Sequence, residues 1–292
     1  MANSEQLALL NLGVTQWNDW RQRSPQTLPD LSDANLSGRQ FEGINLSGAN
    51  LNGAILCNAN FNGAHCAGAT FNDANLMNAS FVNATLKQAT LINAILSAAN
   101  LSGATLCKAV LIGADLKVAL LRRADLSHAD LSATELHGAN LRESDLDAAD
   151  LSRANLSEAM LIAANLSMAT LTRANLDRAE CGQATFYRTK LHAANLTDAR
   201  FVGAYLYGAE LSQTNLSGAD FSWSNLSRVN LSGAKAHKTN LRGVDFSRAD
   251  LSDANLTEAN LRGANLSEAM LAGATWVGAD LSDVKGDRSA AN

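Results

Sequence analysis

The segment ADLSHADLSATELHGANL, residues 124–141, repeats a five-residue pattern: a small residue, a polar residue, a leucine and two further small or polar residues. The same register runs from Leu31 to Leu281 without an insertion or deletion. All 8 phenylalanines of the chain stand in the central position otherwise held by leucine. The period of five is therefore the strongest structural signal in this sequence.

A period of five fits neither a simple helix nor a long strand. Five residues rotate an α-helix by about 500°, so the leucines would spiral around it instead of forming one face. In a strand, side chains alternate with a period of two, and the small residue and the leucine would change faces in successive repeats. The chain must turn once per pentad, and the glycines two residues after the central residue mark that corner.

The two ends of the chain depart from the pattern. We predict one helix over residues 4–23, because Asn3 and Gln6 fit a capping box and the apolar residues that follow have helical spacing. This gives an N-terminal helix and proline-containing linker at 1–30, repeats at 31–284 and a frayed tail at 285–292. The helix is expected to cover the first leucine layer; docking or dimerisation through Trp20 is the alternative. Trp276 replaces a central leucine and is expected to plug the last coils.

Composition narrows the class of protein. The chain has 292 residues, 47% hydrophobic, with 4 cysteines and a net charge of −5, which excludes disorder and a disulfide scaffold. No apolar run is long enough for a membrane helix, and the N-terminus lacks the basic region of a secretory signal. We expect a cytoplasmic protein that does not bind nucleic acid through net charge.

The pattern Ala-(Asn/Asp)-(Leu/Phe)-(Ser/Thr)-x resembles the pentapeptide-repeat proteins over residues 31–284. The resemblance implies an all-β solenoid, a right-handed quadrilateral β-helix with four pentads in each 20-residue coil. Its length would be about 12–13 coils, with a short N-terminal α-helical cap. The segment GVTQWNDWRQRSP, residues 13–25, is similar to the leader of cyanobacterial members.

The sequence offers no catalytic constellation. Catalysis needs converging groups in a cavity, and a rod packed with leucine provides none. The histidines lack partners at metal-ligand spacing, and Cys66 and Cys181 fall on central positions as small apolar residues. We therefore predict a protein that is not an enzyme and holds no cofactor or metal. A pocket with at least two converging titratable side chains would favour an enzyme instead.

An aromatic and basic patch is the leading candidate binding surface. Residues 20 apart are expected to stack, which brings the three tyrosines of the chain to one side and a tryptophan to the adjoining corner. Tyrosine, tryptophan and arginine are frequent anchors of protein interfaces. A local ladder that only stiffens the coil is the alternative. The candidates are Tyr187, Arg188, Tyr205, Tyr207, Trp223 and Arg228.

Two further patches follow from the same stacking. The acidic one could attract a basic partner or a cation, or be a solvated face; it comprises Asp125, Asp130, Asp145, Asp147 and Asp150. The apolar one, Ile92, Val110 and Ile112, is a candidate for weak self-association, so that the protein is a monomer or a weak dimer through this patch or the N-terminal helix.

These features predict a non-enzymatic interaction or scaffold protein with an unidentified protein partner. Some similar proteins imitate the shape and charge of duplex DNA and bind DNA gyrase, which gives the alternative function. A DNA mimic needs continuous negative charge. Here acidic segments such as 121–160 alternate with basic ones such as 161–200, which argues against mimicry.

Overall fold

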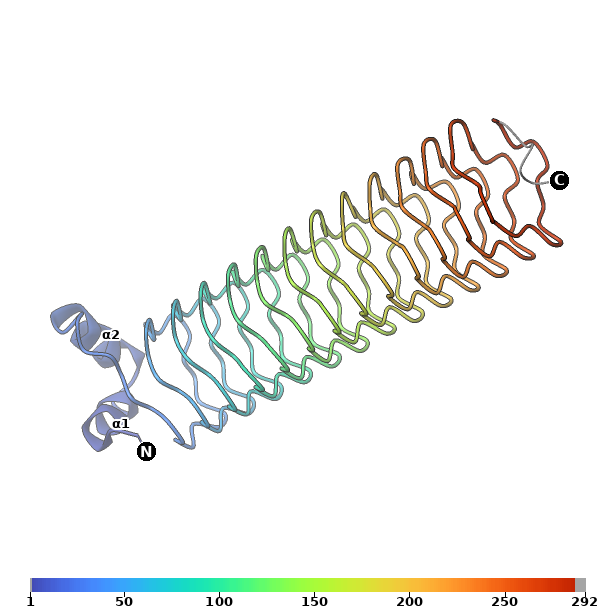
Figure 1. Cartoon of the computed structure of the whole chain (residues 1–292). Helices are drawn as coiled ribbons and strands as arrows, with labels where there is room; N and C mark the ends of the chain where they lie inside the picture. Colours follow the sequence, from blue (N-terminus) through green and yellow to red (C-terminus); the bar gives the residue numbers. More distant parts are fainter. Residues whose placement is uncertain (1, 287–292) are drawn as a thin grey trace. The chain divides into compact units, whose positions relative to one another are not determined.

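The computed structural model describes residues 2–286. The chain divides into two compact units, Met1–Asp145 and Leu146–Asn292, and each is described by itself. Figure 1 shows that both consist of stacked coils and that two helices stand at the N-terminal end of the first. Neither of these helices is long and apolar enough to cross a membrane.

Parallel backbone bridges between residues 20 apart build both units. They run from Asp30–Asn50 to Asp125–Asp145 in the first unit, and from Asp150–Thr170 to Asn265–Lys285 in the second. Each bridge is one residue long, because the chain turns before a strand can extend. Four pentads thus complete one coil, as the resemblance implied. Lys285 still bridges, one residue beyond the predicted end of the repeats, and residues 287–292 of the predicted tail lie outside the described residues.

Every pentad has the same corner. The amide of the small residue donates to the carbonyl of the preceding central residue, as from Ala54 to Leu51 at 3.1 Å. The residue between them, two after the central one, has a φ of +50° to +72° throughout both units. A turn of this kind requires a positive φ at its third residue. Glycine holds many corners, as expected, but asparagine, arginine, alanine and even Val118 hold others.

The interior of each unit is filled by central residues and the small residues two before them. In the first unit, Phe61 stacks on Phe81 with centroids 4.7 Å apart and an interplanar angle of 8°. In the second, Phe201 stacks on Phe221 at 4.6 Å. These pairs confirm the expectation that residues 20 apart stack. Buried threonines replace some alanines, and their hydroxyls donate hydrogen bonds to backbone carbonyls. The Thr189 hydroxyl, for example, donates to the carbonyl of Leu166 at 2.7 Å.

The N-terminal segment forms two helices rather than the single one predicted. Helix α1 spans Ser4–Asn11 and helix α2 spans Val14–Arg23. The single-helix prediction is wrong because Gly13, with a φ of 112°, caps α2 in a conformation that no helix interior contains. Asn3 caps α1 as expected, accepting from the amides of Glu5 and Gln6. The side chain of Gln6 does not complete a capping box, since its Oε1 accepts a hydrogen bond from the backbone N–H of Asp30 instead.

Both helices bond to backbone groups of the first coil that have no preceding coil to pair with. Asp30 donates its N–H to Oε1 of Gln6 at 2.7 Å, and its carbonyl accepts from the amide of Asn3 at 2.9 Å. In the next coil, the equivalent amide of Asn50 donates to the carbonyl of Pro29. Backbone and side-chain groups of the N-terminal segment therefore take the place of a preceding coil.

At the far end of the second unit the packing loosens. Trp276 occupies its central position but is only half-buried, as is Leu281. The Trp276 indole N–H is inaccessible to water and has no hydrogen-bond partner within the described residues. The Trp276 ring, which was expected to fill the last coils, is therefore partly exposed.

Candidate functional site

The three tyrosines of the chain meet on one side of the second unit. Tyr187 and Tyr207 follow central residues 20 apart, and Tyr205 precedes the same central residue as Tyr207. Their ring centroids lie 6.0–6.4 Å apart with interplanar angles of 8–16°. Tyr205 is 40% exposed and the other two are half-buried. The coil thus holds three nearly parallel rings at its surface.

Two exposed arginines at the neighbouring corners extend this cluster. The guanidinium of Arg188 lies 5.3 Å from the ring centroid of Tyr187, and that of Arg228 lies 5.9 Å from the centroid of Tyr207. Both arginines have a positive φ, and their side chains extend outward from the corner. Cation–π attraction at such distances favours this arrangement. We call Tyr187, Arg188, Tyr205, Tyr207 and Arg228 the tyrosine–arginine surface.

Trp223 stands at another corner and is 63% exposed. Its ring occupies the space that a Cβ at Gly243 would need, and the guanidinium of Arg242 lies 5.6 Å from its centroid. The ring thus packs on Gly243 and pairs with Arg242. Arg242 was missed because its role depends on the direction in which the indole turns.

A pocket of about 360 Å³ adjoins the tyrosine–arginine surface. It is lined by Tyr207, Ser227, Arg228, Ser247, Arg248 and Glu268. Nε and Nη2 of Arg248 donate to the two oxygens of Glu268 at 2.9 and 3.3 Å. Sequence reasoning missed Arg248 and Glu268, although they share the 20-residue phase of Arg228 and so could have been found.

Four titratable side chains, those of Tyr207, Arg228, Arg248 and Glu268, line this pocket, which is the feature expected to favour an enzyme. However, hydrogen bonds and charge attraction from Arg248 hold the pKa of Glu268 below its usual range, and Glu268 raises the pKa of Arg248. Both groups therefore keep their charge at neutral pH. A general acid or base needs a pKa near the working pH. The pocket suits the binding of charged groups better than proton transfer.

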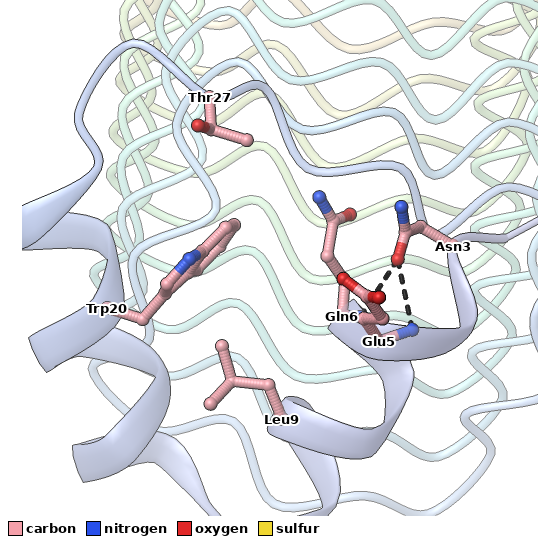
Figure 2. A pocket seen from close by; sticks show the side chains of 6 residues that line it. All are labelled: Asn3, Glu5, Gln6, Leu9, Trp20 and Thr27. Atoms are coloured by element: carbon pink, nitrogen blue, oxygen red, sulfur yellow. Dashed lines mark hydrogen bonds between the residues drawn. The ribbon is translucent and has the colours of Figure 1, made fainter.

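The N-terminal helices enclose two more pockets, of about 330 and 380 Å³, which share Leu9 and Trp20. Figure 2 shows the first, with the Trp20 ring of α2 and Leu9 of α1 on one side and the polar first turn of α1 on the other. Trp20 is half-buried, and its ring centroid lies 5.0 Å from that of Trp17. Trp20 is thus only partly covered by the two helices.

The acidic candidates are divided between the two units. Asp125 and Asp145 bridge in the first, which also contains Asp130, while Asp147 and Asp150 belong to the second. Asp125 accepts from the amide and hydroxyl of Ser127 at 3.0 and 2.6 Å. Asp130 and Asp150 each accept from the amide two residues later. These carboxylates support local turns, and no cluster of metal-ligand type occurs among residues 2–286.

The apolar candidates lie in the first unit. Val110 bridges to Thr90, and Ile112 is 37% exposed, whereas Ile92 is half-buried. Sequence reasoning did not select Ile55, Met77 and Ile95, which are 43%, 42% and 38% exposed. The outward apolar side chains of this unit are therefore scattered over more positions than the predicted trio.

The surroundings of the cysteines do not favour a reactive thiol. Cys66 and Cys181 are buried, as expected for replacements of leucine, and burial raises the pKa of the Cys66 thiol to about 12. A thiol with so high a pKa is a poor nucleophile at neutral pH. Cys57 and Cys107 are half-buried and form no disulfide.

A comparison with curated proteins finds no significant match. Among solved structures, the chain is similar to HetL, a pentapeptide repeat protein involved in heterocyst differentiation regulation from the cyanobacterium Nostoc sp. strain PCC 7120. The identity is 28% over 91% of this chain and 92% of that chain, with a TM-score of 0.42. The chain is also similar to Rfr23 from the cyanobacterium Cyanothece 51142, at 35% identity over 32% of this chain and 64% of that one, with a TM-score of 0.31. Full-length QnrB1, a plasmid-mediated fluoroquinolone resistance protein, shows 19% identity over 70% of this chain and 85% of that one, with a TM-score of 0.35.

A family model described as pentapeptide repeats matches 8 times and spans nearly all of the coiled region. The matches cover residues 30–65, 59–97, 99–138, 139–178, 154–192, 184–222, 224–263 and 259–288. They agree with the five-residue corners and the 20-residue bridges found in both units. The chain is a member of the pentapeptide-repeat family.

Proposed function

We propose that this protein is a non-enzymatic interaction or scaffold protein and that it contacts a protein partner through the tyrosine–arginine surface, with Trp223 at its margin. The observation that carries the proposal is the set of three parallel tyrosine rings under two arginines. Aromatic residues and arginine dominate the binding energy of many interfaces.

Rigidity supports this assignment. The rings are attached to a backbone that hydrogen-bonds to the next coil, as from the amide of Arg188 to the carbonyl of Tyr207 at 3.0 Å. Ordering a flexible side chain on binding costs about 0.5–1.5 kcal/mol. Side chains that are already held in place avoid much of that cost, so a partner would gain more from each contact.

The alternative is that the tyrosines only stabilise neighbouring coils. A variant with Tyr187, Tyr205, Tyr207 and Trp223 changed to Ser separates the two possibilities. A control changes Met270 and Val277 to Ser, since these side chains are 56% and 73% exposed in the same unit and lie outside the tyrosine–arginine surface. Cross-linking in native lysate followed by mass spectrometry should recover a partner with wild type and control but not with the aromatic variant. Equal recovery by folded aromatic and control variants would refute the assignment.

We also propose the finer architecture implied by the family: right-handed, quadrilateral coils, about 12–13 in number, with α1 and α2 as an N-terminal cap. The free thiols of Cys57 and Cys107 suit a reducing compartment, which supports a cytoplasmic location. The leader-like segment at residues 13–25 supports a cyanobacterial origin. For oligomeric state we propose a monomer, or a weak dimer through Ile92, Val110 and Ile112 or the N-terminal helices.

A further inference from the structure

One corner of the second unit carries a row of arginines that ends in a glutamate. Positions at successive 20-residue steps along this corner hold Arg188, Gly208, Arg228, Arg248 and Glu268. All five have a φ between 51° and 65°, so the side chains of the three arginines and Glu268 leave the coil at equivalent points. Stacked coils are about 4.8 Å apart, which sets the spacing of these charges.

The contacts of Glu268 indicate that this corner can bind a carboxylate. Its carboxylate is held by two donors of Arg248, and nearby Arg228 also lowers its pKa. The fork of an arginine matches the two oxygens of a carboxylate in this way. Glu268 is thus a carboxylate of the chain itself that is bound by an arginine at the edge of the pocket.

Arg228 differs from Arg248 in its partners. It lines the pocket and lies over the Tyr207 ring, but it takes part in none of the ion pairs formed by the described residues. A guanidinium that uses its face on a ring still has N–H donors at its edge. Arg228 can therefore receive a carboxylate while Arg248 remains paired with Glu268.

The surrounding charges limit the kind of ligand. Asp245 and Asp250 accept from the amides of Ser247 and Ser252 beside this corner, and Glu210 lies on the adjoining side. These acids would repel a continuous polyanion such as nucleic acid. They would be tolerated by a protein segment that carries a few separated carboxylates.

We propose that the Tyr207–Arg228–Arg248 pocket binds a Glu or Asp side chain from an acidic segment of a protein partner, and that Glu268 is an internal competitor for Arg248. This inference rests on the proposed interaction function and adds the chemistry of the partner. Arg228 and the Tyr207 hydroxyl receive the first carboxylate, and displacement of Glu268 from Arg248 admits a second.

The test uses the full-length protein and two labelled peptides, one alternating Glu with Ser and the other Gln with Ser, in fluorescence anisotropy titrations at low and high salt. Glu268→Gln should bind the Glu peptide about two- to five-fold more tightly than wild type, because it releases Arg248 from an exposed ion pair. Arg228→Gln should bind it about five- to ten-fold more weakly.

Matched variants separate a specific site from a change in net charge. Glu258 pairs with Lys238 at 3.5 Å, 20 residues apart on another corner, so Glu258→Gln removes the same charge from another exposed ion pair. Arg173→Gln matches Arg228→Gln, since Arg173 is an exposed corner arginine with a φ of 59°. Both controls should bind the Glu peptide as wild type does.

The proposal is overturned if Glu268→Gln and Glu258→Gln tighten binding equally, if the Gln peptide binds as well as the Glu peptide, or if no variant binds the Glu peptide. Preferential binding of a phosphopeptide or an RNA oligonucleotide would also overturn it. The interaction function is judged separately by the aromatic Ser variant. Loss of the partner by that variant, together with no effect of Glu268→Gln, would leave the interaction function standing and remove only the carboxylate pocket.

Discussion

The side chain of Asn18 in α2 holds the backbone of Asn45 in the first coil. The Asn45 amide donates to Oδ1 of Asn18 at 2.8 Å, while Nδ2 of Asn18 donates to the carbonyl of Gly43 at 3.0 Å. The indole of Trp17 adds a donor to the carbonyl of Asn45 at 2.8 Å. Asn18 and Trp17 of α2 thus supply the two hydrogen bonds that a preceding coil would provide to the backbone of Asn45.

Changing Asn18 to Ala should destabilise the N-terminal coils by about 1 kcal/mol, because it leaves part-buried backbone groups of Gly43 and Asn45 without their partner. Hydrogen exchange of the Asn45 amide and denaturant unfolding are the measurements. Gln22→Ala, an exposed change in the same helix, is the control and should have little effect. Unchanged exchange at Asn45 in Asn18→Ala would show that the side chain does not stabilise the coil end.

Val118 is strained. It is a β-branched residue with a φ of 50° at a corner where other pentads have glycine or asparagine, and it is 55% exposed. Val118→Asn should stabilise the protein by about 1 kcal/mol, because asparagine tolerates the left-handed region. Thermal and denaturant unfolding measure the gain. Val110→Asn, at a bridging position rather than a corner, should give no gain; similar gains in both would exclude relief of strain as the cause.

Gly243 and Gly203 form a matched pair for testing the packing of Trp223. Both have a φ of 66°, but a Cβ at Gly243 would meet the Trp223 ring, whereas one at Gly203 meets nothing within 4 Å. Each Ala variant should lose about 1 kcal/mol from backbone strain. Only Gly243→Ala should also shift the tryptophan emission and increase acrylamide quenching. The same spectra for both variants would contradict the observed position of the ring.

Asp30 should contribute to the acid sensitivity of the first coil. Hydrogen bonds from Ser32, followed by one from Asn50, hold the pKa of this carboxyl below its usual value of 3.8. Because the pKa is lower in the folded state, the stabilisation is present above pH 3.8 and is lost as the pH falls through the native pKa. Asp30→Asn should flatten the dependence of unfolding free energy on pH below 4. If the dependence of unfolding free energy on pH below 4 is the same in Asp30→Asn as in wild type, the acid sensitivity of the first coil comes from other carboxyls.

The charge pattern predicts no action on DNA gyrase. The tyrosine–arginine surface adjoins arginines rather than a continuous acidic face, so it does not present the charge of duplex DNA. A supercoiling assay with increasing protein, with and without a quinolone, should show neither inhibition nor protection. A concentration-dependent effect of either kind would revive the DNA-mimic hypothesis.

The sequence alone determined the coil and its contents. A strict period of five allowed neither a helix nor a long strand. The 20-residue coil that the family resemblance implied then placed Tyr187 in line with Tyr207, because such a step returns each side chain to the same side. The tertiary structure decided what periodicity does not encode. Gly13 divided the expected helix, Asn18 reached Asn45, the Trp223 ring turned onto Gly243, and Arg248 closed on Glu268. Backbone register follows from local repetition, whereas the direction of a long side chain depends on which neighbours leave it room and offer it a partner.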